Sequence, residues 1–216
     1  YLFQYQRKVH PVDYGGQAVE YINVILSDIY RANEIAGEAS VGSAVVTQVA
    51  AGPDLVMLHG ASGNARDFTF DLIGRLSDRY RCIAFDRPGM GYTGHTDPRY
   101  AAVFTSAAES PAEQATLLAR ASGQLGSGAP MVLGHSFGGT IALAWGLDQP
   151  ARALVLLGAA SNRWEGGLGP LYAVNASAPG AALAVPLLCA TVGEDRIRRI
   201  TAGIFAPDAM PDGYFD

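Results

Sequence analysis

Met-Val-Leu-Gly-His-Ser-Phe-Gly-Gly, residues 131–139, is the stretch of this sequence that decides the fold. Its apolar beginning, 131–134, predicts a buried strand, and 137–147, which Pro150 ends, predicts a helix. Residues 134–138 between them satisfy the pattern G-x-S-x-G. A turn this tight holds its central residue in strained backbone, and a Cβ on either flanking residue would collide with the neighbouring strand or helix. The stretch therefore predicts a strand, a tight turn and a helix with Ser136 at the turn.

The surroundings of Ser136 are those of a catalytic nucleophile. Its hydroxyl would lie at the N-terminus of the helix, where the backbone amides and the helix dipole favour a developing negative charge. With a strand before the turn and a helix after it, we interpret Ser136 as the nucleophile. The alternative is a glycine-rich turn with an incidental serine. Adjacent residues on such a turn point in different directions, so we expect His135 to pack behind it and not to act as the base.

Short apolar runs alternate with helical segments from residue 54 onward. We expect strands over 54–58, 81–85, 131–134 and 153–157, and helices over 65–80, 111–125 and 137–147. Ser110-Pro111-Ala112-Glu113 has the pattern of a capping box with proline at the first helical position. Strand–helix alternation of this kind indicates parallel strands joined by helical crossovers.

The earliest apolar stretch is 19–35. Its residues Val19, Ile22, Leu26, Ile29 and Tyr30 fall on one helical face, which predicts an amphipathic helix. A membrane-surface role for that helix is the alternative. No apolar run reaches the roughly 18 residues that would span a bilayer.

Three landmarks carry a resemblance to the α/β-hydrolase superfamily. They are Leu-His-Gly-Ala-Ser-Gly-Asn at 58–64, Asp-Arg-Pro-Gly-Met-Gly-Tyr at 86–92, and the glycine-flanked serine at 134–139. Their order and spacing fit the superfamily, and the resemblance covers about residues 54–160. It implies an α/β fold with a mostly parallel sheet flanked by helices, a partial cap or lid, and an incomplete C-terminus. It implies no metal and no organic cofactor.

The same resemblance assigns roles around the nucleophile. In the superfamily, the residue after His-Gly and the residue after the nucleophile donate the two oxyanion-hole N–H groups, which here are Ala61 and Phe137. Ser62 is the neighbour that could substitute for Ala61, and we expect it to contact substrate.

A dinucleotide site is the competing interpretation of residues 89–94, Gly-Met-Gly-Tyr-Thr-Gly, because they satisfy G-x-G-x-x-G after a strand. A pyrophosphate would need a helix to open at the third glycine, whereas His-Thr-Asp-Pro follows. The hydrolase landmark explains these residues better.

We expect two parts in the chain: a hydrolase core over 1–160 and a cap or lid over 161–216, which is rich in glycine and proline. Trp164 is expected to line the entrance above Ser136 and to contact substrate. In the alternative, 187–192 is a sheet strand and Asp195, just after it, is the triad acid.

The sequence has no histidine at the place where the superfamily has its general base. The superfamily order is serine, acid, histidine, whereas all four histidines precede Ser136: His10, His59, His95 and His135. We therefore expect these 216 residues to be inactive alone and to be a fragment of the catalytic unit.

The amino-acid composition limits the kinds of partner and the location that we expect for the protein. Hydrophobic residues make up 49% of the chain and charged residues 16%, which is typical of a globular protein. The net charge of −5, without a Lys/Arg run, argues against nucleic acid as a partner. Two cysteines, Cys82 and Cys189, make no disulfide framework and favour a cytoplasmic location.

The predicted function is a serine hydrolase that acts on a small ester, amide or related carbonyl compound through an acyl-enzyme at Ser136. The alternatives are a catalytically silent binding protein of the same fold, and an acyltransferase or perhydrolase with the same nucleophile. The oligomeric state is left open.

Overall fold

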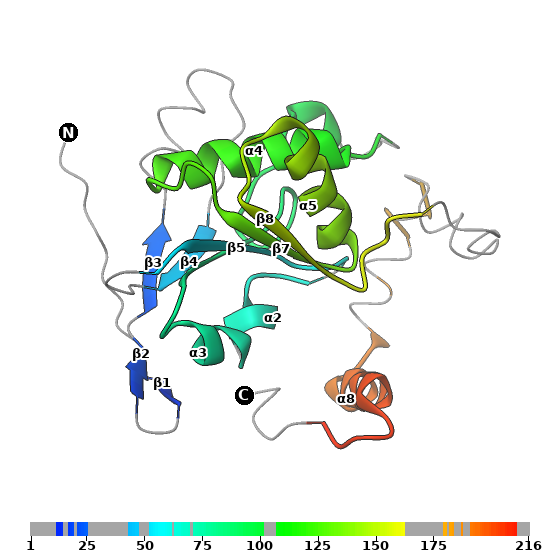
Figure 1. Ribbon diagram of the computed structural model, residues 1–216. Helices are drawn as coiled ribbons and strands as arrows, with labels where there is room; N and C mark the ends of the chain where they lie inside the picture. Colours follow the sequence, from blue (N-terminus) through cyan, green and yellow to red (C-terminus); the bar gives the residue numbers. More distant parts are fainter. Residues whose placement is uncertain are drawn as a thin grey trace. The chain divides into compact units, whose positions relative to one another are not determined.

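The computed structural model describes residues 12–14, 17–19, 21–25, 43–47, 52–61, 63–69, 71–101, 107–162, 179–180, 182–183, 187 and 191–210 (Figure 1). The chain divides into two compact units. The first unit comprises Tyr1–Ala101 and Ala107–Arg163, and the second comprises Ala102–Ser106 and Trp164–Asp216.

A six-stranded sheet organises the first unit, with the order β3-β4-β6-β5-β7-β8. The strands are β3 (Tyr21–Ile25), β4 (Ser43–Thr47), β5 (Asp54–Leu58), β6 (Arg81–Phe85), β7 (Met131–His135) and β8 (Ala153–Leu157). The strands β6, β5, β7 and β8 are parallel, whereas β4 pairs antiparallel with β6 and β3 antiparallel with β4. A separate hairpin joins β1 (Val12–Tyr14) to β2 (Gln17–Val19). The mostly parallel α/β fold expected from the sequence is confirmed.

Helices cover both faces of this sheet (Figure 1). They are α2 (Arg66–Thr69) and α3 (Leu72–Leu76) on one face, and α4 (Pro111–Gln124) and α5 (Phe137–Asp148) on the other. Alternate residues of the parallel strands enter different core clusters. In β5, Val56 and Leu58 pack on the side of α4 and α5, while Leu55 and Met57 pack on the side of α2 and α3. A strand that is buried on both faces has to be apolar, which is why 55–58, the buried part of β5, is an unbroken apolar run.

The prediction of a helix over 19–35 is wrong for those of its residues that the structure describes. Tyr21–Ile25 is strand β3, with Ile22 opposite Val46 of β4, and Val19 closes strand β2. Tyrosine, isoleucine and valine favour the pleated surface of a sheet, and the backbone hydrogen bonds to β4 outweigh a weak helical spacing. Residues 26–35 lie outside the described residues. The helix predicted over 65–80 is two short helices, α2 and α3.

The second unit contains helix α8 (Glu194–Phe205). Leu187 and Thr191 are also helical, and the Thr191 hydroxyl donates to the Leu187 carbonyl at 2.6 Å. The described residues of 187–192 are therefore not in the sheet, and Asp195 lies in the exposed first turn of α8 instead of on a strand end. In the described parts of the chain, none of the helices combines the length and the apolar character needed to cross a membrane.

Candidate active site

Ser136 occupies a strained turn between β7 and α5. Its φ is 52° and its ψ is −117°, and it is the one non-glycine residue with positive φ in the described part of the chain. Three backbone hydrogen bonds impose this conformation. Ser136 N–H donates to the Leu157 carbonyl at 2.9 Å, and the Ser136 carbonyl accepts from Gly139 at 3.0 Å and from Ala160 at 3.2 Å. Backbone strain that the surrounding structure enforces is characteristic of functional sites.

The glycines that flank Ser136 are required by the closeness of neighbouring backbone. A Cβ on Gly134 would collide with the carbonyl of Gly138, and a Cβ on Gly138 would collide with the carbonyl of Leu58 at the end of β5. The absence of side chains therefore lets α5 start directly against β5 and β7. This packing leaves the Ser136 side chain at the N-terminus of α5, at the carboxyl edge of the parallel strands, where α/β proteins bind ligands.

The His-Gly loop after β5 lies beside the serine. A Cβ on Gly60 would be 3.2 Å from the Ser136 Cβ. Fully buried His59 holds this loop: its Nε2 accepts from the Arg87 backbone N–H at 2.9 Å, so its proton is on Nδ1, which donates to the Gly60 carbonyl at 2.9 Å. Burial lowers the pKa of His59 below its ordinary 6.5, and the imidazole is neutral.

The loop after β6 makes hydrogen bonds to the same region through two buried charged residues, Asp86 and Arg87. The Asp86 carboxylate accepts from the backbone N–H of Ala65 at 2.9 Å and of Tyr92 at 3.3 Å. Arg87, only 2% exposed, donates from Nη2 to the Gly60 carbonyl at 2.9 Å and from Nη1 to Gln114 Oε1 at 3.1 Å. Burial lowers the pKa of Arg87 below its ordinary value, while the negative charge of Glu109 opposes that shift.

The sequence-predicted site residues fall into two groups. Ser136, Phe137 and Gly60-Ala61 lie at one edge of the sheet, with Ala61 exposed and Ser136 and Phe137 half-buried. Ser62 and Trp164 lie outside the described residues.

Two contributors to this region, Arg87 and Gln114, were not predicted from the sequence. Arg87 belongs to the landmark at 86–92, which was a usable signal, whereas nothing local marks Gln114 on helix α4.

The described histidines differ in their surroundings. His135, expected to pack behind the turn, is exposed, and its Nδ1 would lie 3.1 Å from a Cβ on Gly60. His95 Nδ1 is 3.2 Å from a carboxylate oxygen of Glu109. Both ring nitrogens of His59 are occupied by backbone groups.

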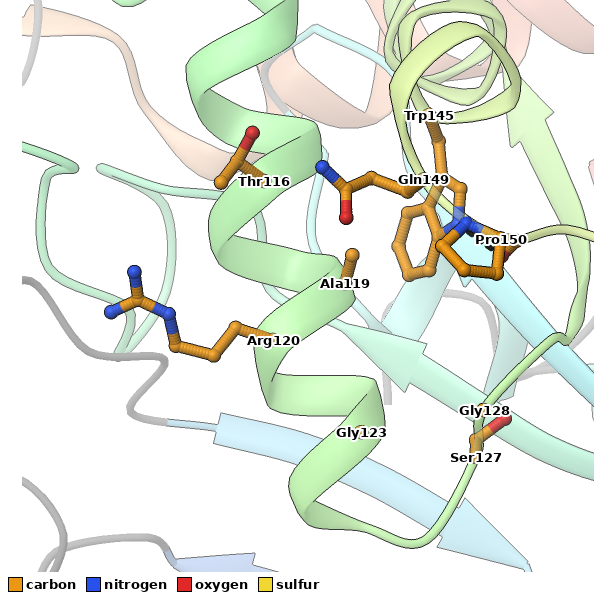
Figure 2. Close-up of a pocket in the computed structure, with 9 residues that line it drawn as sticks. All are labelled: Thr116, Ala119, Arg120, Gly123, Ser127, Gly128, Trp145, Gln149 and Pro150. Carbon is orange, nitrogen blue, oxygen red and sulfur yellow. Dashed lines mark hydrogen bonds between the residues drawn. The ribbon is translucent and has the colours of Figure 1, made fainter.

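A hollow of about 250 Å³ lies on the other side of the first unit, between the C-terminal parts of α4 and α5 (Figure 2). It is lined by Thr116, Ala119, Arg120, Gly123, Ser127, Gly128, Trp145, Gln149 and Pro150. Because Ser136 precedes α5 whereas Trp145, Gln149 and Pro150 lie at its far end, this hollow is not part of the candidate site.

Comparison with known proteins identifies relatives. A family model described as "Alpha/beta hydrolase family" matches residues 55–216. The chain is 33% identical over 130 residues to the magnesium-chelatase 30 kDa subunit of Rhodobacter capsulatus, which covers 60% of this chain and 43% of the relative. It is also 33% identical over 100 residues to the dihydrolipoyllysine-residue acetyltransferase component of the acetoin cleaving system of Cupriavidus necator, covering 46% of this chain and 24% of that protein. The chain thus spans less than half the length of either relative.

Solved structures show the same fold. An alpha/beta hydrolase fold protein from Burkholderia ambifaria superposes with a TM-score of 0.52 at 18% identity, covering 79% of this chain and 58% of that one. The N-acyl homoserine lactonase AidH, complexed with N-hexanoyl homoserine, superposes with a TM-score of 0.50 at 24% identity, covering 73% and 53%.

Proposed function

The chain belongs to the alpha/beta hydrolase family, and on that basis we propose that it is a serine hydrolase whose Ser136 is acylated by a small ester, amide or related carbonyl compound. The observation that carries the proposal is the backbone at Ser136. It is the one strained non-glycine residue of the described chain, it begins helix α5, and it lies beside the His-Gly loop.

The reaction follows from this placement. Ser136 Oγ attacks the carbonyl carbon, and the resulting oxyanion accepts hydrogen bonds from the backbone N–H groups of Ala61 and Phe137. Each such donor lowers the barrier by about 3 kcal/mol. Collapse expels the alcohol or amine and leaves an ester on Ser136, which water then cleaves to release the acid and restore the serine.

The proton of Ser136 has to pass to a base. His59 and His95 are engaged with other groups, and His135, although exposed beside Gly60, is adjacent to the serine on a tight turn. We propose no residue of this chain for that role. Residues 161–216 are proposed to form a cap in which Trp164, together with Ser62 of the core, contacts the acyl group.

The test uses the full-length protein, because these 216 residues are expected to be inactive alone. Covalent labelling of Ser136 by a fluorophosphonate probe is measured beside hydrolysis of p-nitrophenyl esters. Ser136→Ala should abolish labelling and lower turnover by about 10³- to 10⁶-fold. Ser77→Ala is the matched control, because Ser77 is the C-cap of α3 on the face of the sheet opposite α5, and it should leave both readouts unchanged. Labelling that survives Ser136→Ala would contradict the assignment of the nucleophile.

A catalytically silent subunit is the second candidate. It is favoured by the relative from Rhodobacter capsulatus, which is named as a subunit of a magnesium chelatase and is 33% identical over 130 residues. The same labelling experiment separates the two functions. A folded, unaltered full-length protein that takes up no probe at Ser136 would support the silent subunit.

A further inference from the structure

Arg87 is a buried cation that contacts no carboxylate among the described residues. Its guanidinium donates to two neutral acceptors, the Gly60 carbonyl and the Gln114 side-chain oxygen, and its Nε has no described partner. The negative charge of Glu109 offsets only part of the cost of burying this charge, because burial is the larger effect on the pKa of Arg87. An arginine here is therefore unfavourable unless its contacts do something that a neutral side chain cannot.

The contact with Gly60 determines the direction of a neighbouring N–H group. The Gly60 carbonyl and the Ala61 N–H belong to one planar trans peptide and so point in opposite directions. The Gly60 oxygen accepts from Arg87 Nη2 at 2.9 Å, from His59 Nδ1 at 2.9 Å and from Gly63 N–H at 3.3 Å. These donors fix the peptide plane and aim the Ala61 N–H away from them. The positive charge of Arg87 also polarises the peptide, which strengthens its N–H as a donor.

The same guanidinium contacts the residue that supplies the second donor. It lies over the Phe137 ring, 5.0 Å from the ring centroid, which is within cation–π range. Phe137 is the first residue of α5 and follows Ser136 directly. One side chain therefore bridges the loop after β5 and the start of α5, the two segments that carry the backbone donors.

We propose that Arg87 is a positioning residue that aims and polarises the Ala61 N–H and seats Phe137, so that both N–H groups converge on the oxyanion formed at Ser136. This role rests on the proposed function, because it concerns the oxyanion of that reaction.

The test compares the hydrolysis of an oxo ester with that of its thiono analogue by the full-length protein. Sulfur accepts hydrogen bonds more weakly than oxygen, so the preference for the oxo ester measures how well the oxyanion hole is aligned. Arg87→Met should lower kcat for the oxo ester by about 10- to 100-fold with little change in KM. The ratio of kcat/KM for the oxo ester to that for the thiono ester should fall by a similar factor. If Arg87→Met does not fold, Arg87→Lys, which keeps the buried charge but cannot make all three contacts, is measured in the same way.

Arg81→Met is the matched control. Arg81 lies at the opposite end of β6, where it pairs with Asp54 at 2.6 Å and donates to the Leu125 carbonyl at 3.1 Å. Its loss should lower stability and leave the oxo-to-thiono ratio unchanged. Equal losses for the two esters in the Arg87 variants, or a similar fall of the ratio in Arg81→Met, would overturn the positioning role while the nucleophile stands. Absence of Ser136-dependent turnover in the unaltered full-length protein would overturn the proposed function and the role of Arg87 with it.

Discussion

His59 shows how one residue connects stability to the candidate site. The side chain is fully buried, and both ring nitrogens are committed to the backbone of the loops that lie near Ser136. Protonation would place a hydrogen on Nε2, where the Arg87 N–H already donates, so the folded state resists the charged imidazole. Burial is the largest cause of the lowered pKa, and the positive charge of Arg87 adds to it.

The stability of the protein should therefore depend on pH through His59. Because the folded pKa lies below 6.5, the unfolded chain binds the proton first as pH falls. The stabilisation by neutral His59 is complete above about pH 6.5 and is lost as pH falls through the folded pKa. His59→Gln removes this titration, so its free energy of unfolding should fall less steeply on acidification than that of the unaltered protein. Urea denaturation of both proteins at about pH 7.5 and about pH 5.5 measures the difference. If the free energy of unfolding fell equally steeply with acidification in His59→Gln and in the unaltered protein, this explanation would be contradicted.

At the scale of elements, helix α4 begins at the capping box that the sequence predicts. Ser110 Oγ accepts from the Glu113 N–H at 3.2 Å, and the Glu113 carboxylate accepts from the Ser110 N–H at 2.8 Å. Tyr100 and Arg99 also donate to that carboxylate. The Ser110 backbone N–H is the largest cause that lowers the pKa of Glu113 to about 2. The start of α4 is therefore joined to the short 3-10 helix Pro98–Ala101.

Ser110→Ala should lower the free energy of unfolding by about 1 kcal/mol, because the N-cap hydroxyl is lost. The pKa of Glu113 is lowered in the folded state, so the ionised carboxylate contributes to the free energy of unfolding above about pH 4.5. This contribution is lost as the pH falls toward 2. The cost of Ser110→Ala should accordingly shrink over that range. Urea denaturation measures both effects, with Ser161→Ala as the control for loss of an exposed hydroxyl. An equal cost at neutral and at strongly acidic pH would show that Ser110 and Glu113 act independently.

At the scale of the whole molecule, the residues considered for catalysis belong to two different units of the chain. The landmarks at 58–64, 86–92 and 134–139 all belong to the first unit, whereas Asp195 belongs to the second. Asp195 lies in the exposed first turn of α8, where a carboxylate favours the positive end of the helix dipole. The helix explains this acidic residue without any catalytic role.

Asp195→Asn should therefore leave kcat nearly unchanged, because an exposed carboxylate near a helix N-terminus affects stability, by at most about 1 kcal/mol, and not the chemical step. An acid that orients a catalytic histidine would instead cost about 10⁴-fold when it is replaced by its amide. Steady-state ester hydrolysis distinguishes these outcomes, with Ser136→Ala as the reference for complete loss. A loss of thousands-fold in Asp195→Asn would restore Asp195 as the triad acid.

Local signals in the sequence predicted a large share of the first unit. The bounds of β5, β6 and β8 agree with the expected strands, because each strand is marked by its own run of apolar residues. The strands β5 and β6 are buried over most of their length, whereas β8 is half-buried to exposed. The start of α4 is marked by its cap, and the turn at Ser136 by glycines that leave room for adjacent backbone. Each of these signals is contained within a few neighbouring residues.

Features that depend on residues far apart in the sequence were determined only by the tertiary structure. Tyr21–Ile25 is a strand because β4 pairs with it, a contact that the helical spacing of its own side chains does not reveal. The exposure of His135 and the contacts of Arg87 with Gly60, Gln114 and Phe137 likewise depend on how β5, β6, α4 and α5 pack together. The sequence alone identified the serine and its turn, because their pattern is local. The buried arginine beneath the proposed oxyanion hole emerged only from the fold, because its partners come from three separate segments of the chain.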